Sequence, residues 1–147
     1  MTPILGIDLD TKRVTLAYRV GKAWHVESQQ TNDTSGLINA LLNAYGSGVE
    51  KAYIEQPWLR LNSNTYAKLC GVFGLLEGLC RYAGIESIGV NPRTWQSAMF
   101  AVHGKRDEMK RLSILRAAAE GAAPRNDHEA DAVCIAVWAA VKERNAA

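Results

Sequence analysis

The stretch Ile4-Leu5-Gly6-Ile7-Asp8 is a short apolar strand that ends in a carboxylate, and Ala52-Tyr53-Ile54-Glu55 repeats that pattern further along the chain. Burying an unpaired carboxylate is costly, so a buried strand should not end in one. A third group of acids, in the run 127–131, opens the last predicted helix. Clustered carboxylates raise one another's pKa, and a divalent cation relieves that repulsion. Carboxylate oxygens suit Mg²⁺ or Mn²⁺, so the sequence predicts a metal centre.

Length and composition indicate one globular domain over residues 1–147. The chain is 48% hydrophobic and 22% charged, which are ordinary values for a globular protein and argue against disorder. No apolar run approaches the roughly 18 to 20 residues that span a bilayer, and the N-terminus carries no basic leader or cleavage-site pattern. We therefore expect a cytoplasmic protein with no membrane partner. The net charge of +2 alone implies no particular ligand.

Hydrophobic periodicity and turn residues predict an α/β fold. The predicted strands cover residues 3–9, 14–18, 24–27, 49–56 and 85–90. The predicted helices cover residues 34–45, 62–83, 92–100, 105–120 and 125–143, with Thr34 or Ser35 as the cap of the first. The first three strands follow one another through short turns and read as an antiparallel meander. The later strands alternate with helices long enough for crossovers, which implies parallel pairing.

This order of elements and acids resembles the ribonuclease H-like nuclease fold and, within it, the RuvC-type Holliday-junction resolvases. Three motifs carry the resemblance: Gly6-Ile7-Asp8, Ile54-Glu55-Gln56-Pro57-Trp58 and His128-Glu129-Ala130-Asp131-Ala132. The resemblance covers nearly the whole chain and implies a mixed five-stranded sheet in the order 3-2-1-4-5, with strands 1–3 antiparallel and helices on both faces. The compact form is similar to the resolvases of bacteriophages, which points to a bacterial or phage-infected host cell.

The resemblance implies catalytic metal ligands, which we assign to Asp8, Glu55, His128 and Asp131, holding two Mg²⁺ ions with Mn²⁺ as a substitute. At the third motif, helical position slightly favours Asp127 and the resemblance favours His128, which we choose; either residue could instead cap the helix. Asp10 shares the strand parity of Asp8 and is either an extra ligand or, as we prefer, a turn residue.

By the same resemblance, Trp58 wedges against unpaired bases at a junction, although it could also pack on Leu59 and the following helix. Between Asn91 and Arg116 there are six basic and two acidic residues, a local charge of +4. Such a segment is either a solvated helix face or a phosphate-binding surface. Whether Lys105 or Lys110 fills the family's catalytic-lysine role stays open. We predict these DNA-binding residues: Trp58, Arg60, Arg93, Lys105, Arg106, Lys110 and Arg111.

The long predicted helix, residues 62–83, carries a stripe of small residues, Ala67, Gly71, Gly74 and Gly78, at spacings of four, three and four. Each glycine costs a helix roughly 1 kcal/mol, so close approach of another backbone would be a compensating gain. That backbone could belong to the sheet beneath. It could instead belong to the same helix of a second subunit, as the resemblance implies, giving a homodimer.

The leading interpretation is a Mg²⁺-dependent endodeoxyribonuclease that resolves four-way (Holliday) DNA junctions by paired, symmetric phosphodiester hydrolysis with two metal ions. One alternative is a nuclease of the same fold with relaxed specificity for flap DNA, branched DNA or RNA. Another is a non-catalytic nucleic-acid-binding domain of this fold.

Overall fold

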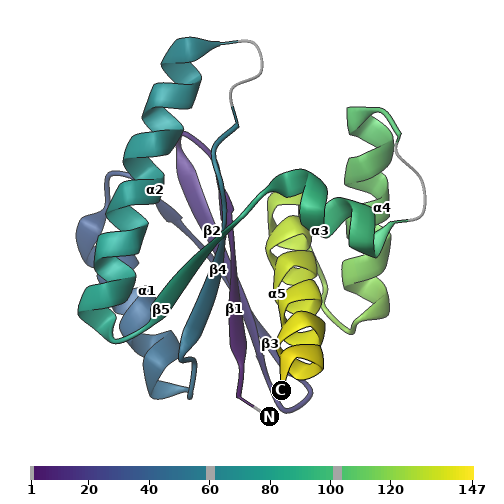
Figure 1. Cartoon of the computed structure of the whole chain (residues 1–147), viewed down its shortest axis with the longest axis horizontal. Helices are drawn as coiled ribbons and strands as arrows, with labels where there is room; N and C mark the ends of the chain where they lie inside the picture. The colour runs from purple at the N-terminus through teal and green to yellow at the C-terminus, as the bar shows by residue number, and fades with distance from the viewer. Residues whose placement is uncertain (1, 59–61, 101–103) are drawn as a thin grey trace.

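The computed structural model describes residues 2–58, 62–100 and 104–147 and contains a five-stranded sheet in the order β3-β2-β1-β4-β5 (Figure 1). Strand β1 pairs antiparallel with β2 and parallel with β4; β2 pairs antiparallel with β3, and β4 parallel with β5. The predicted order and directions are therefore confirmed. The strands are β1 (Ile4–Leu9), β2 (Arg13–Val20), β3 (Ala23–Gln30), β4 (Lys51–Glu55) and β5 (Glu86–Val90).

In the described part of the chain, five helices lie on the two sides of this sheet. Helices α1 and α2 lie on one side, and α3, α4 and α5 lie on the other (Figure 1). They are α1 (Thr34–Gly46), α2 (Ser63–Ala83), α3 (Pro92–Met99), α4 (Arg106–Ala119) and α5 (Asp127–Ala146). The N-terminus of α5 lies at the end of the sheet where β1 and β4 finish, so the helix runs antiparallel to both strands (Figure 1).

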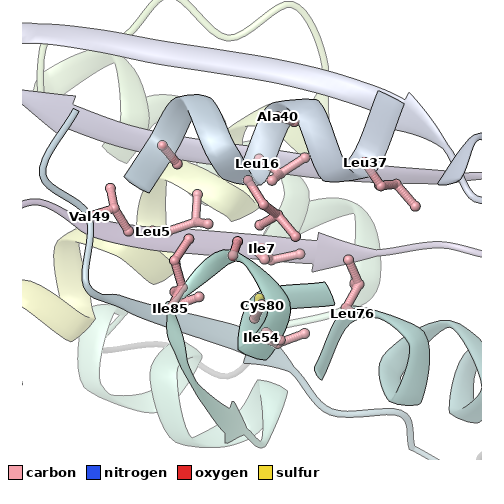
Figure 2. Close-up of a cluster of buried hydrophobic side chains, with 14 of the residues drawn as sticks. Leu5, Ile7, Leu16, Leu37, Ala40, Val49, Ile54, Leu76, Cys80 and Ile85 are labelled. Atoms are coloured by element: carbon pink, nitrogen blue, oxygen red, sulfur yellow. The ribbon is translucent and has the colours of Figure 1, made fainter. Parts of the chain in front are cut away.

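The larger core lies between the sheet and the layer formed by α1 and α2. Leu5 and Ile7 of β1 point into it and meet apolar side chains from the neighbouring strands and both helices (Figure 2). Because strand residues alternate in direction, Ile4, Gly6 and Asp8 face the opposite layer. The first strand is thus buried on both faces, and Asp8 points toward α5.

Helix ends differ in part from the predictions. The cap of α1 is Asp33, whose carboxylate accepts from the Gly36 amide, rather than Thr34 or Ser35. The cap of α5 is Asn126 rather than Asp127 or His128, because its amide oxygen accepts from the Glu129 amide. In both cases the cap lies just N-terminal to the predicted one, and both sites keep the usual cap chemistry.

The stripe of small residues on α2 does not pack on the sheet. Among the residues that the structure describes, a Cβ atom added at Gly71, Gly74 or Gly78 would meet no atom within 4 Å. The prediction that the sheet beneath these glycines could explain them is wrong, because the helix turns Leu76 and Cys80 inward instead. No helix in the described ranges is long and apolar enough to cross a membrane.

Candidate metal centre

Gly6 allows the last helix to lie directly on the first strand. A Cβ atom at this position would come within 2.6 Å of the Ala136 amide nitrogen and even closer to the Ala132 carbonyl oxygen. Alanines at positions 132 and 136 of α5 complete this close contact, and both are buried. Because α5 lies so near β1, the side chains of its first two turns reach the carboxylate that follows Gly6 by two residues.

Asp8 is buried, with 3% of its surface exposed, and contacts His128. The Nδ1 atom of His128 lies 2.8 Å from Oδ2 of Asp8. Burial raises the pKa of Asp8 to about 6, an effect that the hydrogen bond from His128 partly offsets. The same hydrogen bond raises the pKa of His128 to about 9. The contact therefore favours the charged form of His128 and opposes the effect of burial on Asp8.

Glu55 ends β4, one residue beyond the pairing of Ile7 with Ile54. Its strand is thus the parallel neighbour of the one that carries Asp8, at a spacing of about 4.8 Å. Its carboxylate faces the same layer, because Oε2 accepts a hydrogen bond of 3.1 Å from the indole Nε1 of Trp95 in α3. The two strand-end acids therefore share one edge and one face of the sheet.

Asp131 lies one helical turn after His128 on α5. Burial raises its pKa to about 7; the charge of Asp8 adds to the rise, and a hydrogen bond from the Ser113 side chain opposes it. The carboxylate of Asp8 is thus close enough to repel that of Asp131. Ser113 is itself buried, with 2% exposed, in α4.

The remaining acids near the site have other partners. Asp10 accepts from the Thr11 amide at 2.8 Å, as the predicted turn residue would, and its Oδ2 atom also lies 3.9 Å from Nε2 of His128. Asp127 forms an ion pair of 3.6 Å with Lys110 of α4. It is therefore His128, rather than Asp127, that contacts Asp8.

The donor set suits a hard divalent cation, although it is not gathered in one place. Among the residues that the structure describes, no three His, Cys, Asp or Glu side chains lie together closely enough to hold a metal ion. Burial nevertheless raises the pKa values of Asp8 and Asp131, and nearby carboxylates add to both shifts: Asp10 and Asp127 for Asp8, and Asp8 and Asp127 for Asp131. Carboxylate oxygens are the ligands that Mg²⁺ and Mn²⁺ prefer, and the charge of a bound cation would relieve the repulsion between them. The chemistry of these carboxylates thus fits such a cation, and the assignment of the four residues as its ligands stays a prediction.

We expect Asp131→Asn to stabilise the metal-free protein more at pH 8 than at pH 5. The folded-state pKa of about 7 lies above the ordinary value of 3.8, so the folded state binds the proton more tightly than the unfolded chain does. Stability from this group is therefore fully present below pH 3.8 and is lost as the pH rises through 7. Asparagine removes that loss. Urea unfolding in EDTA at both pH values measures it, with the exposed Asp107→Asn as the charge control. A larger gain at pH 5 would contradict this origin of the shift.

Trp58 and one of the predicted basic residues, Arg93, lie together where β4 ends and α3 begins. The Arg93 guanidinium lies 4.7 Å from the centre of the Trp58 ring, which joins the end of β4 to the start of α3. Lys105, Arg106 and Arg111 are exposed, and Lys110 is half-buried beside Asp127. The predicted contact residue Arg60 and the alternative partner Leu59 lie outside the described residues.

Sequence reasoning missed two side chains that contact the candidate ligands, Trp95 and Ser113. Trp95 reads as one more apolar residue of an amphipathic helix, and Ser113 as an ordinary small residue of a basic helix. Neither lies in a motif, and each reaches its carboxylate from another element, across 40 and 18 positions of sequence. Only the packing of α3 and α4 against the sheet and α5 reveals them.

Comparison with solved structures places this fold among RuvC structures. The chain resembles Thermus thermophilus RuvC in complex with a Holliday junction substrate, with a TM-score of 0.76, 18% identity and coverage of 99% of this chain and 96% of that one. A second Thermus thermophilus RuvC structure gives a TM-score of 0.74 and 19% identity, covering 99% of this chain and 97% of that one. No family model and no curated protein matches the sequence. The ribonuclease H-like fold of the RuvC type is thus confirmed.

Proposed function

We propose that this protein is a Mg²⁺-dependent endonuclease that resolves four-way DNA junctions by paired, symmetric hydrolysis. One observation carries the proposal: Asp8, next to the last residue of β1, and Glu55, the last residue of β4, lie on adjacent parallel strands, on the face where the first turns of α5 carry His128 and Asp131. The fold supports it, since one similar RuvC structure contains a Holliday junction.

Asp8, Glu55, His128 and Asp131 would hold the metal. Bound Mg²⁺ ions at such a site activate the attacking water and stabilise the leaving oxygen of a phosphodiester. Asp8 belongs at the centre of the site, because it contacts His128 and is repelled by Asp131. His128 can act as a ligand only after losing its proton, so metal and proton compete for it.

The chain's own cations would bind the phosphate backbone. Lys110 is held 3.6 Å from Asp127, at the first turn of the helix that carries His128, so its ammonium group lies at the margin of the candidate site. This contact favours Lys110 over Lys105 as the lysine that stabilises charge on the phosphate. Exposed Lys105, Arg106 and Arg111 extend the positive surface along α4.

Trp58 would contact a base at the junction. The indole lies after Pro57, which restricts the turn out of β4, and the Arg93 guanidinium lies against it at 4.7 Å. Stacking of an unpaired base on an aromatic ring contributes about 1–3 kcal/mol. Arg93 can in addition bind the phosphate of the same nucleotide.

A homodimer through α2 would place two such sites on one junction. The stripe Ala67, Gly71, Gly74 and Gly78 lies on the exposed face of α2 and continues to Tyr82, whose surface is 74% exposed. Glycines without an intramolecular neighbour permit a second helix to approach the backbone closely. A twofold axis there would relate two active sites, as symmetric incision requires.

We expect Gly74→Leu to dissociate the dimer without weakening the monomer fold. A Cβ atom at position 74 meets no atom of the described residues within 4 Å, and leucine is a better helix former than glycine by roughly 1 kcal/mol. Sedimentation velocity over a concentration series measures the association. Ala118→Leu, at an exposed position of α4, is the matched control and should leave the dimer intact. A monomeric wild-type protein at every concentration would remove the dimer from the proposal.

The function itself is tested by incubation with a labelled four-way junction and Mg²⁺, with nicks mapped on all strands. Paired nicks at symmetric positions are expected, with much slower cutting of a flap and of plain duplex. Comparable rates on all three substrates would favour the nuclease of relaxed specificity. Binding without cleavage in either Mg²⁺ or Mn²⁺ would favour the non-catalytic domain.

A further inference from the structure

Trp95 reaches Glu55 because α3 begins where β5 ends. Val90, the last residue of β5, pairs with Glu55 in the parallel ladder. Asn91 then caps α3 by accepting a hydrogen bond of 2.9 Å from the Arg93 amide. Trp95 lies in the first turn of α3 and donates from Nε1 to Oε2 of Glu55 at 3.1 Å. The donor and the carboxylate thus come from two neighbouring strand ends.

The indole of Trp95 is held firmly. Its side chain has no exposed surface and belongs to the apolar cluster that includes Tyr53, Val90 and Ile135. The Phe100 ring packs edge-on against it, with the ring centres 6.2 Å apart. An indole N–H can only donate, and a buried one needs an acceptor. The N–H group of Trp95 is therefore a donor at a fixed position.

Glu55, by contrast, has a long side chain that needs such a support. A glutamate side chain has three rotatable bonds, and fixing it in one conformation costs free energy. Carboxylates that bind metals are commonly oriented by hydrogen bonds from residues outside the ligand set, whose loss reduces metal affinity or activity about 10- to 100-fold. We propose that Trp95 is a positioning residue that aims the Glu55 carboxylate at the cation site. This inference rests on the proposed function, because it takes Glu55 as a ligand.

The test measures Mn²⁺ binding to the full chain by electron paramagnetic resonance, without DNA. Trp95→Phe removes the N–H and should weaken Mn²⁺ binding about 10- to 100-fold. Because a smaller ring also leaves a cavity, benzothienylalanine in place of Trp95 is the second variant, with a sulfur atom where the N–H was and nearly the same shape. The matched control is Trp24→Phe, which removes an indole hydrogen bond to the Glu120 carbonyl, away from the site. It should bind Mn²⁺ as the wild type does.

Glu55→Ala separates this inference from the proposed function. If Trp95 acts through Glu55, removing the N–H should have no further effect on Mn²⁺ binding in the Glu55→Ala background. If Glu55→Ala weakens Mn²⁺ binding while both position-95 variants bind like the wild type, the role of Trp95 is overturned. The assignment of Glu55 as a ligand is then unaffected. Unchanged binding in Glu55→Ala would overturn the site assignment and this inference together. If the position-95 variants lose the same factor in Mn²⁺ affinity with and without the Glu55 side chain, Trp95 has a purely structural role and the inference is wrong.

Discussion

Asp8→Asn is expected to abolish Mg²⁺-dependent cleavage of a four-way junction and to leave junction binding nearly intact. Asparagine keeps the shape but removes the buried charge that contacts His128 and raises the pKa of Asp131. Metal ions supply several kcal/mol of transition-state stabilisation, and each 1.36 kcal/mol is tenfold in rate, so a loss of about 10³-fold or more follows. DNA affinity should change little, because the basic residues and Trp58 lie on other segments. Single-turnover cleavage and a gel-shift titration with Ca²⁺ measure the two properties.

The control for this change is Asp33→Asn. Asp33 caps α1 at a position where asparagine is an equally good cap, so the variant makes the same chemical change away from the site. It should cut at the wild-type rate. Cleavage by Asp8→Asn within a few-fold of the wild-type rate would exclude Asp8 as a metal ligand.

Gly6→Ala is expected to lower the stability of the protein strongly, unlike an alanine at any of the α2 glycines described above. The new Cβ would overlap the backbone of α5 at Ala132 and Ala136, and neither strand nor helix can yield without separating the two layers. Overpacking of a rigid contact costs typically 1–3 kcal/mol and occasionally more. For a domain of this size that lowers the melting temperature by about 3–10 °C. Thermal unfolding followed by circular dichroism measures the shift.

Gly46→Ala is the matched control, since a Cβ atom there meets no atom within 4 Å. It should unfold at or slightly above the wild-type temperature, because alanine is the better helix former. Replacing glycine with alanine should therefore lower the melting temperature at position 6 of β1 and leave it unchanged or slightly raise it at position 46 of α1. An unchanged melting temperature in Gly6→Ala would show that the two layers adjust to the extra methyl group.

Much of the fold could be predicted because its determinants are local. Alternating apolar residues identified β1, and crossover helices long enough for parallel pairing placed β4 and β5 beside it. The acids at positions 8 and 55 could be assigned to one edge for the same reason: parallel strands end together. The face was also predictable from period-two alternation, once Leu5 and Ile7 were taken as core residues.

What could not be predicted depends on contacts between distant elements. Helical position alone favoured Asp127, but the rotation of α5 on β1 brings His128 to Asp8 and leaves Asp127 to Lys110. That rotation follows from the contact of Gly6 with α5, which no periodicity encodes. The glycines of α2 could equally face the sheet or a second subunit, because a helical wheel shows which residues share a face but not what packs against that face.

Helix α3 contacts both the residue proposed to bind DNA and a residue proposed to bind the metal. Its second residue, Arg93, lies against Trp58, and its fourth, Trp95, holds Glu55. Eight residues thus connect the group that would meet an unstacked base with a group that would meet an ion. If both assignments hold, substrate engagement and metal occupancy share a mechanical link, and each should strengthen the other by the same factor. Such an enzyme would bind its metal most tightly when the DNA structure that it cuts is also bound.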